Sequence, residues 1–303
     1  MKKFKITAVL IVMTMILTAC SEKSKSESMD NSDTINVVTS FYGMKALAEE
    51  IGGDKVNIDN IIPEGSEPHD FDIKAKDMKA IEESDIFIYN GAGMEEWVTD
   101  VEAAIGNNKL ITVEASKGVE LINADGSDNN DLGKDPHTWL GLTSAKVEAE
   151  NIKNALQEKD TQNKDYYEKN YEEFAGKIDE IISEYIPKFQ DLEDKEFVTG
   201  HATFGYLCRD LGLTQSSIEG VFAEGEPSPK ELEKLILHCK NYNIKVIFVE
   251  ELISQNLSNT LAKEVGATTK QIYTLHSSED KKSFSDTLRY NVETIYSAMK
   301  QGK

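Results

Sequence analysis

Short apolar segments rich in β-branched and aromatic residues recur along most of the chain and predict β-strands. The segment 85–90 is apolar at most of its positions, which is typical of a strand buried on both faces of a parallel sheet. The predicted strands are 35–39, 56–62, 85–90, 109–113, 196–199, 217–222, 245–250 and 271–275. Half of them fall in the first part of the chain and half in the last part.

Amphipathic segments separate these strands and predict α-helices, because their apolar residues recur every three or four positions. The shorter predicted helices are 41–51, 74–83, 144–157, 204–211, 230–242, 255–265 and 284–300. Strands that alternate with helices form mainly parallel sheets. We therefore expect an α/β fold with two lobes, each containing a mainly parallel four-stranded sheet flanked by helices.

One further helix is predicted to be much longer than the others. Its apolar stripe comprises Tyr167, Tyr171, Phe174, Ile178, Ile181, Tyr185 and Phe189. The stripe runs over roughly 30 residues, or about 40 Å of helix. A coiled-coil dimer would use the same stripe, but the run is isolated. We expect one long helix that links the two lobes of a monomer, with a metal site in the cleft between the lobes.

The N-terminus has the pattern of a secretory signal. Lysines at positions 2, 3 and 5 precede the apolar run 6–17, which is too short for a lasting membrane span. The run ends in Leu17-Thr18-Ala19-Cys20, which resembles the lipobox of bacterial lipoproteins. This resemblance implies that Cys20 is lipidated and becomes the first residue of the mature protein.

The rest of the chain is strongly acidic and long enough for two lobes. The formal net charge is −21 at pH 7, which argues against nucleic acid and against an electrostatic attachment to anionic lipid. A lipid on Cys20 is therefore the only membrane attachment that we predict. We expect a signal peptide at 1–19, a lipidated flexible tether at 20–34, an N-terminal lobe at 35–160, a linking helix at 161–191 and a C-terminal lobe at 192–303.

Three of the five histidines, His69, His137 and His201, lie where a predicted loop meets a strand or a helix. Neutral imidazole is the commonest protein ligand for transition metals, and loop ends on a rigid scaffold can bring distant residues together. These positions indicate a metal site. The alternative is that they are three ordinary polar residues, because no short metal-binding motif fixes their geometry.

Several motifs make the chain similar to the zinc and manganese receptors of bacterial ABC importers. They are E-P-H at 67–69, G-x-G-M-E-x-W at 91–97, D-P-H-x-W-L at 135–140, G-H-x-x-F-x-Y at 200–206 and E-P-S-P-K-E-L at 226–232. The resemblance covers essentially the whole mature chain. It implies that His69, His137 and His201 bind the metal, with Glu279 as the fourth ligand. His276, Asp280 or water are the alternatives for the fourth position.

Three imidazoles and one carboxylate form a tetrahedral set suited to Zn²⁺, whereas a second carboxylate in place of an imidazole would favour Mn²⁺. We therefore expect a lipid-anchored receptor on the extracytoplasmic face of the bacterial membrane that captures Zn²⁺ and delivers it to an ABC permease. A manganese receptor is the alternative within the family. A zinc hydrolase and a surface adhesin are alternatives of other classes; without an H-E-x-x-H motif, we predict no catalytic residue.

Other residues near these motifs have expected supporting roles. Glu67, Asp70 and Asp135 lie close enough in sequence to orient the imidazoles through their second nitrogen, or they are solvated loop acids. The aromatic residues Trp139, Phe204 and Tyr206 are expected to pack in the core. Adjacent helical side chains diverge, so His238 and Cys239 are not expected to form a second metal site. Cys208 and Cys239 form a disulfide or remain buried thiols, and we favour thiols.

Overall fold

The computed structural model describes residues 34–105, 109–124, 133–222, 228–252 and 255–301, without the side chains of Gln255 and Glu279. By its internal contacts the chain separates into Met1–Thr34 and Ile35–Lys303. The predicted signal peptide and the predicted lipidation site Cys20 lie outside the described residues. Among the helices that are described, none is both long enough and apolar enough to cross a membrane.

The first sheet consists of four parallel strands in the order β2-β1-β3-β4. Its strands are β1 (Ile35–Thr39), β2 (Val56–Asn60), β3 (Ile86–Tyr89) and β4 (Ile111–Glu114). The accompanying helices are α2 (Tyr42–Gly52), α3 (Ala75–Glu83), α4 (Val98–Ile105) and α5 (Leu142–Lys159). The first three residues of β3 are fully buried, which agrees with the continuous apolar pattern of this segment.

The second sheet repeats this arrangement, with four parallel strands in the order β6-β5-β7-β8. Its strands are β5 (Glu196–His201), β6 (Thr214–Glu219), β7 (Val246–Val249) and β8 (Thr268–Gln271). The accompanying helices are α7 (Gly205–Leu211), α8 (Pro229–Asn241), α9 (Gln255–Val265) and α10 (Phe284–Gln301). The predicted fold class, with two lobes that each contain a parallel four-stranded sheet, is confirmed.

Two predicted strands lie three residues too late in the chain. The apolar pattern predicts strands at 217–222 and 271–275, whereas β6 and β8 begin at Thr214 and Thr268. β8 is a mostly exposed edge strand of polar residues. Ile272, Tyr273 and Leu275 are buried in the segment that follows β8. The pattern therefore identified buried residues, but only part of each predicted segment pairs in the sheet.

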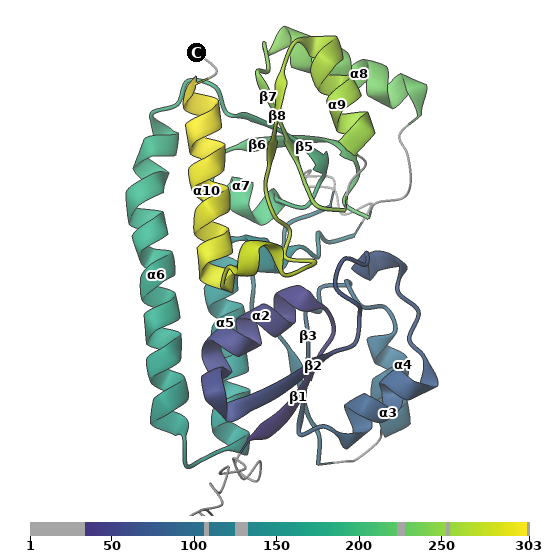
Figure 1. Ribbon diagram of the computed structural model, residues 1–303, viewed down its shortest axis with the longest axis vertical. Helices are drawn as coiled ribbons and strands as arrows, with labels where there is room; N and C mark the ends of the chain where they lie inside the picture. Colours follow the sequence, from purple (N-terminus) through teal and green to yellow (C-terminus); the bar gives the residue numbers. More distant parts are fainter. Residues whose placement is uncertain (1–33, 106–108, 125–132, 223–227, 253–254, 302–303) are drawn as a thin grey trace, which may run out of the picture. The chain divides into compact units, whose positions relative to one another are not determined.

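The long helix α6 spans Lys164–Gln190 and contacts α2 and α5 as well as α7 and α10 (Figure 1). Its buried residues are Tyr167, Phe174, Ile178, Ile181, Tyr185 and Phe189, which are six of the seven positions of the predicted stripe. Pro187 lies in the last turn, where it disturbs few backbone hydrogen bonds. The stripe is therefore an intramolecular packing surface.

One hydrophobic core extends through both halves of the folded unit. It includes Val37 and Phe87 from the first sheet, Phe197 and Phe248 from the second sheet, and Ile178 of α6. A second, smaller cluster lies where α8 and α9 cover the second sheet. Because buried residues from both sheets belong to one packed cluster, the two halves are not independent bodies joined by a flexible segment.

Candidate metal centre

His69 is presented by a short 3-10 turn, η3 (Pro68–Asp70), in the segment that follows β2. Pro68 occupies the first turn position, where its fixed φ is favourable and no N–H is needed. The carboxylate of Glu67 accepts the backbone N–H of His69 at 3.3 Å. Local sequence therefore fixes the backbone that carries the imidazole.

His137 lies just before the 3-10 turn η4 (Thr138–Leu140), and its side chain is fully buried. Oδ1 of Asp135 accepts the backbone N–H of His137 at 2.9 Å and lies 2.8 Å from its Nδ1. An ionised carboxylate only accepts hydrogen bonds, so with Asp135 ionised the imidazole proton is on Nδ1. The lone pair of His137 is therefore on Nε2. The expectation that Asp135 orients this imidazole is confirmed.

His201 is the last residue of β5, at the carboxyl end of a parallel strand, and it is buried. The fully buried carboxylate of Glu250 accepts the backbone N–H groups of Gly200 and His201. The side-chain Nε2 lies 2.9 Å from the carbonyl oxygen of Val221. A carbonyl oxygen can only accept, so Nε2 carries the proton and Nδ1 has the free lone pair.

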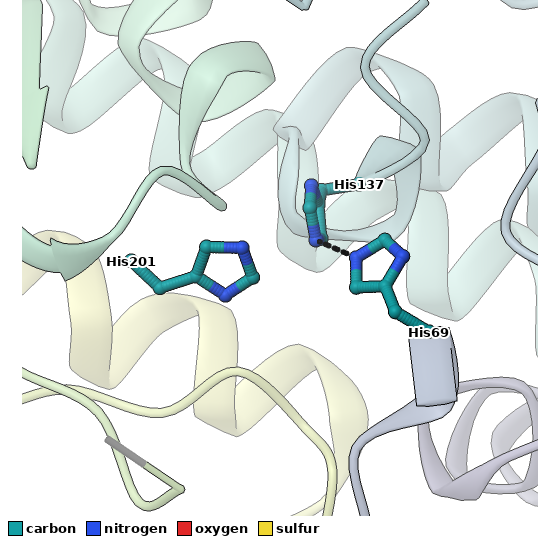
Figure 2. Close-up of side chains that lie close together, drawn as sticks. All are labelled: His69, His137 and His201. Carbon is teal, nitrogen blue, oxygen red and sulfur yellow. Dashed lines mark hydrogen bonds between the residues drawn. The ribbon is translucent and has the colours of Figure 1, made fainter. Parts of the chain in front are cut away.

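The three imidazoles converge, although they come from separate parts of the chain (Figure 2). Each offers one nitrogen to a group in which all such atoms lie within 4.8 Å of one another. The Nε2 atoms of His69 and His137 are 3.2 Å apart. Two nitrogens bound to a tetrahedral zinc ion at about 2.0–2.1 Å are about 3.3–3.4 Å apart. This pair already has the spacing that one zinc ion requires.

Burial keeps these imidazoles neutral. Desolvation, followed by repulsion between the imidazoles, lowers the pKa of His69 and of His201 to about 3, and desolvation lowers the pKa of His137 to about 3. Burial also raises the pKa of the nearby carboxyls of Asp135 and Glu67, the latter to about 7. The site therefore presents unprotonated nitrogen lone pairs, which is the form that binds a metal ion.

A family profile described as "Zinc-uptake complex component A periplasmic", ZnuA, matches residues 37–298, which is most of the chain. The chain belongs to the ZnuA family. The match includes all three converging histidines and both sheets except the first two residues of β1.

Individual proteins resemble the chain over most of its length. The high-affinity zinc uptake system protein ZnuA of Bacillus subtilis is 34% identical over 309 residues, which cover 97% of each chain. Two solved structures each have a TM-score of 0.80 and 33% identity, and the match covers 88% of this chain and 99% of theirs. They are the laminin-binding protein Lmb of Streptococcus agalactiae and a zinc-bound variant of AdcAII of Streptococcus pneumoniae.

The side chain of Glu279, the predicted fourth ligand, is not among the described parts of the structure. Glu279 begins the short turn η5 (Glu279–Lys281). Asp280 is exposed and accepts hydrogen bonds from Tyr273 Oη and Lys282 Nζ. His276 is buried, and its Nε2 has no hydrogen-bond partner among the described residues. Neither of the two residues named as alternatives to Glu279 belongs to the group of converging ligand atoms among the described residues.

Two acids that hydrogen-bond to the backbone around this centre were not identified from the sequence. Glu250 supports the backbone of His201, and Glu251 accepts hydrogen bonds from the backbone N–H groups of Thr274 and His276. Both follow a buried strand of a parallel sheet, at the edge where ligands commonly bind in α/β folds. Their position after a buried strand could have indicated these two acids from the sequence. It does not reveal which backbone groups they contact.

The remaining residues that the sequence singled out do not belong to the group of converging ligand atoms. Asp70 is exposed. Trp139, Phe204 and Tyr206 are fully buried, as predicted, and Tyr206 Oη donates to the carbonyl oxygen of Asp135 at 2.7 Å. His238 Nε2 lies 2.8 Å from Glu196 and does not belong to the histidine cluster. Cys208 and Cys239 are buried free thiols.

Proposed function

We propose that this protein is an extracytoplasmic receptor that captures Zn²⁺ and delivers it to an ABC-type importer in the cell membrane. The observation that carries the proposal is the convergence of three neutral imidazoles, two buried and one partly buried, with ligand atoms within 4.8 Å of one another. Membership of the ZnuA family and the zinc-uptake name of the Bacillus subtilis relative support it. The metal ion is the transported cargo, and the ABC permease is the partner that receives it.

The proposed ligands are His69, His137 and His201, with Glu279 as the fourth. Imidazole nitrogens suit zinc better than manganese, which prefers carboxylate and carbonyl oxygen. A set of three nitrogens and one oxygen therefore favours Zn²⁺ over Mn²⁺. Four protein ligands would also close the coordination sphere, whereas a zinc hydrolase keeps one position open for water. We accordingly assign a binding role and no catalysis.

We further propose that the protein acts as a monomer attached to the membrane through lipid on Cys20. In this arrangement residues 1–19 are the removed signal and 20–34 the tether. Residues 35–160 and 192–303 form the two lobes, and 161–191 the linking segment. A tether keeps the receptor near the permease and raises its effective concentration there.

Adhesion is a second candidate function, because one similar protein of known structure is described as an adhesin. Lmb of Streptococcus agalactiae is described as a bifunctional protein with adhesin and metal transporting activity. An adhesive role for the present protein would require exposure at the cell surface. Binding of the purified protein to immobilised laminin, compared with its metal-free form, tests this role separately from zinc binding.

The decisive experiment measures metal content and competition. The soluble form that begins after Cys20 is stripped of metal and then offered equimolar Zn²⁺ and Mn²⁺. We expect one zinc ion per chain and little manganese. Preferential binding of manganese would overturn the assignment of the cargo, and binding of neither metal would overturn the receptor function. Loss of zinc uptake by cells that lack the protein would then establish the role in transport.

A further inference from the structure

A fourth imidazole is buried close to the three-histidine cluster. His276 follows Leu275, whose φ is +61°, a left-handed conformation that leucine rarely adopts. The carbonyl oxygen of His276 accepts the backbone N–H of Gly65 at 3.0 Å, in the same loop that carries His69. The ring of His276 lies against Trp139, with 6.0 Å between centroids, and Trp139 in turn lies 5.3 Å from His137.

A chain of hydrogen bonds fixes the tautomer of His276. Oε1 of Glu251 accepts the backbone N–H of Thr274 at 3.0 Å and the hydroxyl of Thr274 at 2.8 Å. That hydroxyl has a single hydrogen, so its oxygen must accept in the 3.1 Å contact with Nδ1 of His276. Nδ1 therefore carries the imidazole proton, and the lone pair of His276 is on Nε2.

Nε2 of His276 has no partner for this lone pair. The atom is buried and lacks a hydrogen bond among the described residues, while only 3% of the residue is exposed. A buried acceptor without a partner is unfavourable. A hydrogen-bonded carboxylate that holds Nδ1–H, here through Thr274, is also the arrangement that orients histidine ligands of metal ions. Trp139 contacts both the ring of His276 and the ring of His137, so His276 is one aromatic side chain away from the cluster.

We propose that His276 is an alternative fourth ligand for the metal ion bound by His69, His137 and His201. Through Nε2 it takes the coordination position that Glu279 otherwise fills. The segment after β8 thus offers one imidazole and one carboxylate to the same ion. His276 is not among the three residues whose ligand atoms lie within 4.8 Å of one another, so binding requires a shift of the segment 274–278. This inference rests on the proposed zinc-binding function.

A four-imidazole state has consequences for selectivity and for release. An all-nitrogen donor set discriminates further against Mn²⁺, which prefers oxygen ligands. If His276 replaces Glu279 as the latter leaves, the ion keeps four ligands while the segment after β8 moves. The metal can then change its coordination without an intermediate that has an open position. Release to the permease would follow from the shift of this segment, which also contacts the His69 loop through Gly65.

The test compares the wild type with E279A, H276Q and the double variant E279A/H276Q, with H238Q as a control. His238 is bonded to Glu196 outside the cluster, so H238Q should bind zinc like the wild type. Zinc affinity is measured by chelator competition, and the number of imidazole ligands by X-ray absorption of the zinc-loaded protein. We expect E279A to bind one zinc ion through four imidazoles, and the double variant to bind at least tenfold more weakly than E279A.

Two results would overturn the proposal. One is a count of three imidazoles in zinc-loaded E279A, a measurement that does not depend on any variant at position 276. The other is equal zinc affinity of E279A and E279A/H276Q. Failure of the wild type to bind zinc is a different outcome, because it would refute the proposed function itself.

Discussion

The Nε2 atoms of His69 and His137 lie 3.2 Å apart, although 68 positions separate the two residues in the chain. Two neutral imidazoles at this distance can share one proton or one metal ion between their lone pairs. His137 already donates its own proton from Nδ1 to Asp135. The pair is therefore arranged so that a cation near both nitrogens is favourable.

Replacement of His137 by alanine should remove most of the zinc affinity. The side chain is fully buried and its Nε2 belongs to the converging group. We expect the zinc affinity to fall more than roughly 100-fold. Loss of a residue that only hydrogen-bonds to a metal ligand typically lowers the affinity about 10–100-fold. Chelator competition measures the effect, with His238→Ala as the matched control. Near-normal affinity of His137→Ala would contradict the ligand assignment.

Asp135→Asn should weaken zinc binding by roughly 10–100-fold without abolishing it. The amide can present a donor to Nδ1 of His137, which would favour the tautomer with the proton on Nε2 and remove the lone pair from the ligand position. Asp70→Asn is the matched control, since Asp70 is an exposed acid next to His69. The same loss of affinity in both variants would show that general charge, and not the Asp135–His137 bond, is responsible.

Zinc affinity should fall as the pH falls below about 7. Burial raises the pKa of Glu67 to about 7 and raises that of Asp135, so both are increasingly protonated in the metal-free site below this pH. Bound Zn²⁺ favours the ionised carboxylates, so zinc binding releases a proton from each carboxyl that was protonated. For each proton released, the logarithm of the zinc association constant falls by up to about one for every unit by which the pH falls. The imidazoles, with pKa values of about 3, add to this dependence only in stronger acid.

This pH dependence can be measured by chelator competition at pH 5.5, 7 and 8.5. Glu67→Gln should give a shallower profile, because the glutamine side chain has no proton to release. Equal affinity at all three pH values would contradict the coupling between zinc and the two carboxyls.

Ile178→Ala should destabilise the whole folded unit by about 2–5 kcal/mol, the usual range for truncation of a fully buried aliphatic side chain. Ile178 is on α6 and belongs to the core that contains residues of both sheets. We expect a single, shifted unfolding transition in urea, monitored by both fluorescence and circular dichroism. Two separate transitions would show that the halves unfold independently.

Zinc binding should produce a small tilt of the lobes together with ordering of loops. Glu50 of α2 accepts hydrogen bonds from Lys177 of α6 and from the backbone N–H of Ser285 in α10, and the core is continuous. These contacts join both halves and oppose a wide hinge motion. Crystal structures of the metal-free and zinc-loaded protein provide the measurement. A lobe rotation of tens of degrees between them would refute this expectation.

Features that depend on residues close together in the sequence were predicted well, whereas contacts between distant segments were not. The stripe on α6 was recognised because helical periodicity reports burial along one element. The predicted starts of β6 and β8 were three residues too late; for β8 the reason is that buried apolar residues follow the end of the strand. The contacts of Glu250 and Glu251 were missed, since each joins residues that are brought together only when separate strand ends meet.

The sequence by itself determined the alternation of strands and helices, the long helix and the three histidines at loop ends, because each is a local pattern of residue types. The tertiary structure alone decided that these histidines converge, that Asp135 and Glu250 hold two of them, and that His276 is buried beside the cluster without a partner for Nε2. These are distances through space between distant parts of the chain. They follow from how two sheets and α6 pack around one core, which no local pattern specifies.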